Sequence, residues 1–261
     1  MFDLAAFEAA LAGTVFAGKL HFSPVTDSTN TDAMKAARAG AAHGSVYLAD
    51  EQLTGRGRGD HGWSSPAGEG LYVSVLLRPP MPGRRLPLLP LAAGLAAADS
   101  IRAVSGLEVD LRWPNDLMLG QRKTGGILVE SKTVAGKVAF AVVGIGINVH
   151  QRGFADGLPT PATSLDLEGG RWIHRKDLLV CLLKSLEREA RGLLDPSLAK
   201  AIPRRVEEAS TWVRGRQVEV HGPQACAGVT AGPDERGFLL VRTDAGLVTV
   251  RTGGIRAAEV S

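Results

Sequence analysis

The order of apolar and polar positions along the chain predicts strands interleaved with helices. Residues 71–78 are almost continuously apolar, which is typical of a strand covered on both faces. Residues 88–104 form an alanine-rich stretch with Pro87 and Pro90 near its start, where a helix tolerates proline. Further strands are predicted at 45–49, 109–112, 117–119, 126–130 and 137–149, and further helices at 30–39, 176–194 and 197–210. This pattern indicates an α+β domain.

The character of the chain changes near Trp212. Short apolar segments follow at intervals of about ten residues, which is the spacing of small all-β barrels. These segments span residues 217–221, 225–231, 237–242 and 247–251, with glycine-containing and aspartate-containing turns between them. We therefore expect two domains, at residues 1–212 and 213–261.

Composition and charge narrow the class of protein. The 261 residues are 44% hydrophobic and 22% charged, which suffices for a buried core and argues against disorder. Two cysteines and six histidines without ligand spacing predict neither a disulfide framework nor a structural metal site. The net charge is only +3 and the chain has no run of basic residues, so a pocket for an acidic ligand is favoured over a duplex-binding surface.

The sequence also carries no targeting signal that we recognise. The first residues lack the basic start and apolar centre of a secretory signal. Apolar runs all fall short of the ~20 residues that a membrane span needs. We expect a cytoplasmic protein without a membrane partner.

Residues 53–63, here called the arginine loop, hold the most informative motif. Gly57 to Gly62 satisfies the G-x-G-x-x-G pattern, but Trp63 and a Ser-Ser-Pro segment follow where a dinucleotide-binding site requires a helix. The glycines that flank Arg56 and Arg58 instead allow close approach to a ligand, and two guanidinium groups can grip carboxylate or phosphate oxygens. A solvated basic loop or an RNA-binding patch is an equally good interpretation of the loop alone.

Three other segments carry candidate chemistry, and each has an ordinary structural explanation as well. Asn115 and Asp116 follow an extended Trp113 at a turn, and Lys123 precedes a Gly-Gly pair that opens a strand, although turn residues and solvated lysines are common. Gly144 and Gly146, before Asn148, predict a bulge or a group that packs close to the backbone of this strand. Asn148 needs a hydrogen-bond partner if it is buried there. The polar segment Ser28-Thr29-Asn30 is suited to a polar ligand or to capping a helix.

Together, these segments resemble the biotin protein ligase family over roughly residues 22–149. The resemblance rests on Asp27-Ser28-Thr29-Asn30, Gln52, Gly55-Arg56-Gly57-Arg58, Trp63, Trp113-Pro114-Asn115-Asp116, Lys123 to Glu130 and Gly144 to Asn148. It implies a fold like that of class II aminoacyl-tRNA synthetases, with a mixed sheet flanked by helices and a small SH3-like barrel at the C-terminus. It also implies an enzyme that makes biotinyl-adenylate from biotin and ATP and transfers biotin to one lysine of a biotin carboxyl carrier domain of acetyl-CoA carboxylase or a related carboxylase.

The resemblance assigns roles to particular residues. Biotin is expected to contact Ser28, Thr29, Asn30, Gln52, Gly55, Arg56, Gly57, Arg58, Lys123, Gly126 and Leu128. ATP or the adenylate is expected to contact Arg56, Arg58, Trp63, Asn115, Asp116, Lys123 and Asn148. The expected catalytic residues are Lys123, Arg58 and Asp116, with Mg²⁺ carried by the ATP phosphates and no metal ligands from a protein motif. Because both reactants are anions, cationic side chains are the residue types that this reaction needs.

The sequence departs from the family pattern at three places. His61 stands where an arginine is common, Arg112 replaces a lysine, and Gly253-Gly254 stands where Gly-Asp is common. About twenty residues precede Phe22, too few for the helix-turn-helix domain of ligases that act as repressors, so we expect no DNA partner. Lipoate protein ligase and a non-enzymatic RNA-binding protein remain alternatives, and the oligomeric state stays open, with a homodimer as one alternative.

Overall fold

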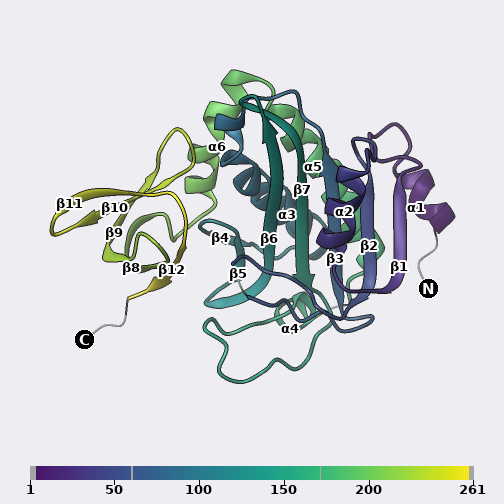
Figure 1. The fold of residues 1–261 in the computed structure, drawn as a ribbon. Helices are drawn as coiled ribbons and strands as arrows, with labels where there is room; N and C mark the ends of the chain where they lie inside the picture. Colours follow the sequence, from purple (N-terminus) through teal and green to yellow (C-terminus); the bar gives the residue numbers. More distant parts are fainter. Residues whose placement is uncertain (1–3, 60, 171, 259–261) are drawn as a thin grey trace.

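The computed structural model describes residues 4–59, 61–170 and 172–258, in which a large mixed sheet lies between helices (Figure 1). The seven strands follow the order β1-β2-β3-β7-β6-β5-β4. Strands β1 and β2 are parallel, and every other neighbouring pair is antiparallel. The strands are β1 (Leu20–Thr26), β2 (Val46–Gln52), β3 (Gly70–Leu77), β4 (Asp110–Arg112), β5 (Asp116–Leu119), β6 (Arg122–Val134) and β7 (Lys137–Asn148). The expected mixed sheet is therefore present.

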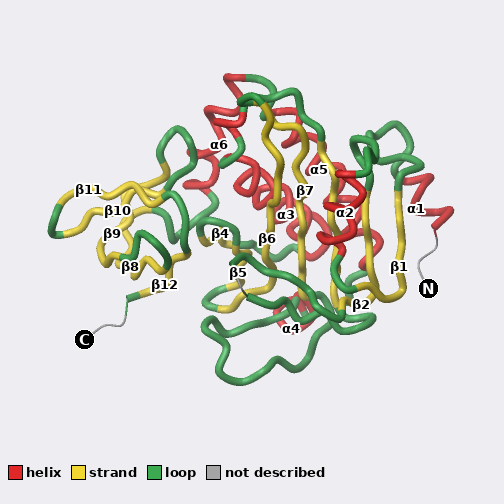
Figure 2. The backbone as a smooth tube through the Cα atoms, in the orientation of Figure 1, coloured by secondary structure: helices red, strands yellow, loops and turns green. Residues whose placement is uncertain are grey.

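Helices cover both faces of this sheet (Figure 2). Helix α2 (Thr29–Arg38) packs on one face against β2, β3 and β7. On the other face, α3 (Leu88–Ser105) packs against β6, and α5 (Arg175–Gly192) and α6 (Pro196–Glu208) pack on α3. The short elements α1 (Leu4–Ala10), η1 (Gly83–Arg85) and α4 (Leu165–Gly169) lie in the connections.

The two most apolar segments of the sequence are the centre of this arrangement. All eight residues of β3 are buried, which confirms a strand covered on both faces. Helix α3 is long and apolar enough to cross a membrane by length and composition, but 67% of it is buried within the described fold. It is therefore explained as a core helix, apolar nearly all round because other elements surround it.

The register of β3, β7 and β6 determines which residues face α2. Paired positions form two rows across the three strands: Ser74, Gly144 and Leu128, and next to them Tyr72, Gly146 and Gly126. Alternate residues of a strand point to the same face, so one face of the sheet centre carries three glycines. This face is where the predicted ligand-binding segments meet.

The C-terminal segment forms a second, five-stranded antiparallel sheet. Its strands are β8 (Arg214–His221), β9 (Cys226–Pro233), β10 (Leu239–Thr243), β11 (Gly246–Val250) and β12 (Gly254–Ala257), in the order β11-β10-β9-β8-β12. The four predicted strands are present and β12 was not predicted. No pairing between β11 and β12 closes the sheet within the described residues, so the barrel is not confirmed.

This second sheet lies beside the β4–β5 edge of the large sheet, at the opposite side from β1 (Figure 1). The indole Nε1 of Trp113 donates a hydrogen bond of 3.0 Å to the carbonyl of Gly237, which links the turn between β4 and β5 to the connection between β9 and β10. The division into domains at residue 212 stays a prediction.

Truncation of Leu182 tests the packing of α5 on α3. Leu182 is fully buried on α5, and Leu182→Ala should lower the free energy of unfolding by about 2–5 kcal/mol, because truncation leaves a cavity. Leu198→Ala is the matched control. Leu198 on α6 is 56% exposed, so its truncation should lower the free energy of unfolding far less. Urea unfolding followed by circular dichroism gives both values. Equal losses in the two variants would contradict this account of the core.

Candidate active site

The floor of the candidate site is the glycine-rich face of β6 and β7. A Cβ atom on Gly146 would lie 2.6 Å from the indole Nε1 of Trp63, and one on Gly144 would collide with the amide oxygen of Asn30. Trp63 also lies in ordinary contact with the position that a Cβ of Gly126 would take. An indole and an amide therefore lie directly on the sheet backbone, which explains why glycines interrupt these strands.

The start of α2 is fastened to the sheet by its polar side chains. Ser28 occupies the N-cap position, but its side chain makes no capping hydrogen bond. The backbone N–H and the hydroxyl of Thr29 donate to Oε1 of Gln52 at 2.9 and 3.1 Å, and the Thr29 hydroxyl lies 2.8 Å from that of Ser74. Asn30 accepts a 2.8 Å hydrogen bond from Ser74. Side-chain capping is therefore the wrong explanation for this segment.

The side-chain hydrogen bonds of Thr29 and Asn30 are part of a longer chain of polar groups, here called the polar chain, that reaches the residues on both sides of the arginine loop. Gln52 Nε2 donates to the Ser65 hydroxyl at 2.7 Å, and Ser65 donates to the carbonyl of Trp63 at 3.2 Å. The polar chain ends on β6, where Asn30 Nδ2 donates to Oε2 of Glu130 at 2.7 Å. Because buried polar groups must be hydrogen-bonded, this chain fixes several side chains together.

The arginine loop itself is a narrow hairpin. The Gly57 N–H donates to the carbonyl of His61 at 2.7 Å, and the Trp63 N–H donates to that of Gly55 at 2.8 Å. A Cβ at Gly55 would strike the Trp63 carbonyl, so this glycine is required for close approach of the two arms. The hairpin brings Trp63 back over the floor.

The two loop arginines have different partners. Arg56 donates to both carboxylate oxygens of Glu130, at 2.9 and 3.0 Å. Arg58 donates to Thr252 Oγ1 at 2.8 Å and to the carbonyl of Gly253, in the connection between β11 and β12. Burial lowers the pKa of Arg58, and the nearby Asp116 carboxylate partly offsets this. The two guanidinium groups thus bind different parts of the protein, and their grip on a ligand stays a prediction.

Asp116 lies between two cations. Lys123 Nζ lies 2.5 Å from Oδ1 of Asp116, and Arg112 Nη2 lies 2.6 Å from Oδ2. Burial alone would raise the pKa of Asp116, but Lys123 and Arg112 outweigh it and hold the pKa below its usual value. The carboxylate is therefore ionised, and its contact with Lys123 places that Nζ 5.4 Å from the centre of the Trp63 ring.

The local backbone differs from the expectation. Trp113, Pro114 and Asn115 form a turn with a cis Trp113–Pro114 peptide bond, whereas an extended Trp113 was expected. Asp116 was predicted at the turn but is the first residue of β5. Pairing with β6 then places its side chain beside Lys123.

The two predicted nucleotide-binding asparagines are engaged in the fold. Asn115 Nδ2 donates to the carbonyl of Ile127 at 2.8 Å, and Asn148 Nδ2 donates to that of Thr163 at 3.0 Å. Gln151 Nε2 lies 3.3 Å from Oδ1 of Asn148. These contacts match the structural explanation that the sequence left open, so contact with a nucleotide stays a prediction for both residues.

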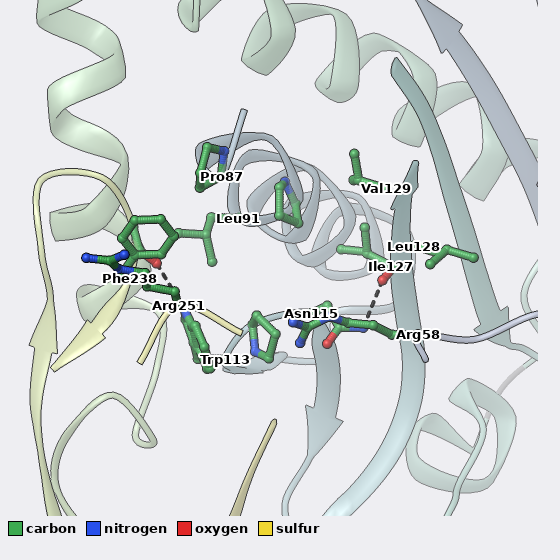
Figure 3. Close-up of a pocket in the computed structure, with 13 residues that line it drawn as sticks. Arg58, Pro87, Leu91, Trp113, Asn115, Ile127, Leu128, Val129, Phe238 and Arg251 are labelled. Atoms are coloured by element: carbon green, nitrogen blue, oxygen red, sulfur yellow. Dashed lines mark hydrogen bonds between the residues drawn. The ribbon is translucent and has the colours of Figure 1, made fainter. Parts of the chain in front are cut away.

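A groove of about 140 Å³ opens beside Arg58, between β6, the start of α3 and the C-terminal sheet (Figure 3). Its walls are mainly apolar, from side chains such as Leu91, Leu128 and Phe238, and guanidinium groups of Arg58 and Arg251 line it. Of the predicted biotin contacts, Leu128 and Arg58 line this groove. The floor glycines lie outside it.

The charges of the site favour an anionic ligand. Among the described residues, Arg56, Arg112 and Lys123 pair with two carboxylates, those of Glu130 and Asp116, and Arg58 binds uncharged groups. Positive charge thus remains to neutralise phosphate or carboxylate oxygens. Within the described residues, no three His, Cys, Asp or Glu side chains gather as a metal site.

Three residues of the polar chain, Glu130, Ser74 and Ser65, were not among the predicted site residues. Glu130 follows Gly126 and Leu128 at alternate positions of β6, and Ser74 lies opposite Gly144. The alternation of strand residues could have placed Glu130 on the site face. No local signal could have placed Ser74, because its position depends on pairing between strands far apart in sequence.

The sequence matches the family described as "Biotin/lipoate A/B protein ligase family" over residues 22–148. The chain is 33% identical to "Bifunctional ligase/repressor BirA" of Bacillus spizizenii, over 90% of this chain and 73% of the relative. It is also 33% identical to "Biotin--[acetyl-CoA-carboxylase] ligase" of Mycobacterium tuberculosis, over 88% of this chain and 85% of the relative.

The fold agrees with these relatives. The biotin protein ligase of Aquifex aeolicus, solved with biotin and ATP, superimposes with a TM-score of 0.77 at 29% identity, covering 92% of this chain and 98% of the other. The fold and the sequence together define a ligase, and the chain belongs to the Biotin/lipoate A/B protein ligase family. Within that family, it is similar to proteins named as biotin ligases.

Asp116→Asn should change how stability depends on pH. A lowered pKa in the folded state contributes stability above the unfolded value of about 3.9, and this contribution is lost as pH falls through the folded pKa. The wild type should therefore exceed the variant by roughly 2 kcal/mol near neutral pH, and the difference should shrink below pH ~4. Thermal unfolding between pH 2 and 7 measures it, with the exposed turn variant Asp244→Asn as control. A difference that stays constant down to pH 2 would refute the assignment.

Gly146→Ala should displace Trp63, because the new Cβ would overlap the indole. We expect a changed tryptophan emission spectrum and a loss of about 1–3 kcal/mol in unfolding free energy. The spectral change should vanish in a Trp63→Phe background, which assigns it to this indole. Gly153→Ala is the control, since open space surrounds Gly153. An unchanged spectrum in Gly146→Ala would mean that Trp63 does not lie on the floor.

Proposed function

We propose that the protein is a biotin protein ligase that activates biotin with ATP as biotinyl-5′-adenylate and transfers the biotinyl group to a lysine of a carrier protein. The observation that carries this proposal is the match, over 92% of the chain, to a ligase solved with biotin and ATP. The charges at the floor support it, because they suit two anionic substrates.

The first step explains why cations dominate the site. The biotin carboxylate attacks the α-phosphate of ATP, a new oxygen–phosphorus bond forms, and pyrophosphate leaves. Lys123 supplies charge to the transferring phosphate, and Arg56 and Arg58 supply it to the surrounding oxygens. Asp116 orients Lys123 through their 2.5 Å contact. In the second step the carrier amine attacks the activated carbonyl and AMP leaves, so the protein needs no nucleophile of its own.

The floor suits the remaining predicted contacts. Thr29, Asn30 and Gln52 offer polar groups for the ureido ring of biotin, and the Trp63 indole on the floor glycines offers a flat apolar surface beside them. We propose that Ser28, Gly55, Gly57, Gly126 and Leu128 complete the biotin contacts, and that Trp63, Asn115 and Asn148 lie toward the nucleotide. We expect ATP to arrive as its Mg²⁺ complex, with the metal held by phosphates.

The C-terminal sheet and the partner complete the proposal. We infer that the five strands belong to an SH3-like unit in residues 213–261, and that the contact of Arg58 with Gly253 ties this unit to the arginine loop. A relative is named as a ligase for acetyl-CoA carboxylase. We propose the biotin carboxyl carrier domain of this or a related carboxylase as the partner.

The alternative functions, a lipoate ligase and an RNA-binding protein, differ from a biotin ligase in the ligand that each would bind. Relatives named as biotin ligases favour biotin over lipoate, and pairing of Arg56 and Arg58 with protein groups argues against a solvated RNA-binding loop. Purified protein incubated with α-labelled ATP and either biotin or lipoate should form a labelled adenylate with biotin. An adenylate formed only with lipoate would overturn the choice, and salt-sensitive RNA binding without any adenylate would overturn the enzyme.

Lys123→Ala should lower the single-turnover rate of biotinyl-adenylate formation by ~100-fold or more, the effect of losing one preorganised donor. Rapid quench with labelled ATP measures this rate. Lys200→Ala, an exposed lysine of α6, is the matched control and should retain the wild-type rate. Near wild-type adenylation in Lys123→Ala would remove this lysine from the mechanism.

A further inference from the structure

Glu130 connects two parts of the candidate site that are far apart in the sequence. Its carboxylate accepts two hydrogen bonds from Arg56, at 2.9 and 3.0 Å, and one of 2.7 Å from Nδ2 of Asn30. Arg56 belongs to the arginine loop and Asn30 to the first turn of α2. One side chain of β6 thus sets the relation between the loop and the helix.

The setting of Glu130 makes this contact specific. Its side chain is 26% exposed and that of Arg56 is 45% exposed, and Arg56 meets both oxygens of the carboxylate. Two parallel hydrogen bonds fix the direction of a guanidinium group as well as its distance. Asn30 cannot turn freely either, because Ser74 donates to its oxygen and Gly144 leaves just enough room for it.

A carboxylate in this place has two opposite effects on an anionic ligand. Its negative charge repels the ligand and competes for Arg56, so removing it should tighten binding. Its hydrogen bonds hold Arg56 and Asn30 in position, so removing it should loosen the loop. The bidentate geometry and the shared contact with Asn30 favour the second effect, because a competing counter-ion alone would not need Asn30.

We propose that Glu130 is a positioning residue for biotin activation, which holds the arginine loop against α2 through Arg56 and Asn30 and thereby keeps the adenylate from escaping to water. The residue touches no reacting atom in this proposal. It acts through Arg56, whose place near the ligand rests on the proposed ligase function. Charge at position 130 therefore governs how much activated biotin reaches the carrier.

Glu130→Gln is the variant that tests this role. Glutamine keeps the size of the side chain and an oxygen for Asn30, but it removes the charge that Arg56 requires. The share of biotinyl-adenylate released to solution, rather than transferred, should rise about 10-fold, the scale of one lost charged hydrogen bond. Released and transferred label are counted after a single turnover with a carrier domain.

Limited trypsin digestion gives a second readout that does not depend on activity. Cleavage after Arg56 and Arg58 should be several-fold faster in Glu130→Gln than in wild type, because the loop has lost its anchor. Glu208→Gln is the matched control: it removes an exposed Arg–Glu pair on α6, and it should leave both digestion and adenylate release unchanged. Circular dichroism checks that the variants are folded, and Glu130→Asp, which keeps the charge on a shorter side chain, should fall between wild type and Glu130→Gln.

A double-mutant cycle shows whether Glu130 acts through Arg56. In an Arg56→Gln background, Glu130→Gln should cause little further release, because the two residues form one unit. Slower release in Glu130→Gln would identify Glu130 as a competing anion and overturn the proposal, as would unchanged release and digestion. If wild-type protein makes no adenylate at all, the ligase function fails, while faster digestion in Glu130→Gln still supports the anchoring of the loop.

Discussion

The site depends on the absence of side chains at Gly126, Gly144 and Gly146. These residues leave one face of β6 and β7 bare, so that the amide of Asn30 and the indole of Trp63 lie against the backbone. Any Cβ at the last two positions would push these groups off the sheet. Glycine weakens a strand by roughly 0.5–1 kcal/mol relative to alanine, and β7 pairs along its length with β3, all of whose residues are buried. A rigid apolar core therefore supports a thin polar floor.

The charged side chains at this floor are balanced by direct contacts between individual cations and carboxylates. Glu130 pairs with Arg56, and Asp116 pairs with both Lys123 and Arg112, whose charges lower the pKa of Asp116 despite the burial of its carboxylate. Arg112 contributes more than the charge of a lysine could, because it donates to Asp116 through two nitrogens and also to Thr160. Substitution of lysine by arginine there thus preserves the charge and adds geometric control.

The sequence predicted most elements correctly because their apolar runs are long. Strand β3 and helix α3 came out within a residue or two of their predicted bounds. Strand β1 was not predicted, because Pro24 and polar residues interrupt its apolar positions, as suits the edge of the described sheet. The motifs predicted Lys123 and Asp116 as residues of one site, and the structure brings their side chains into contact. The motifs could not show that Arg56 and Arg58 diverge, since partners from β6 and the C-terminal segment are fixed only by tertiary packing.

The contact of Arg58 explains how the chain tolerates its departure at Gly254. Arg58 binds the carbonyl of Gly253 and the hydroxyl of Thr252, and neither group depends on the side chain at position 254. Gly253 itself has a φ of 118° and lies so close to His221 that a Cβ would strike its carbonyl, so glycine is required there. The link between the loop and the C-terminal sheet is therefore a backbone property, set by the turn before β12, and it persists whatever residue follows.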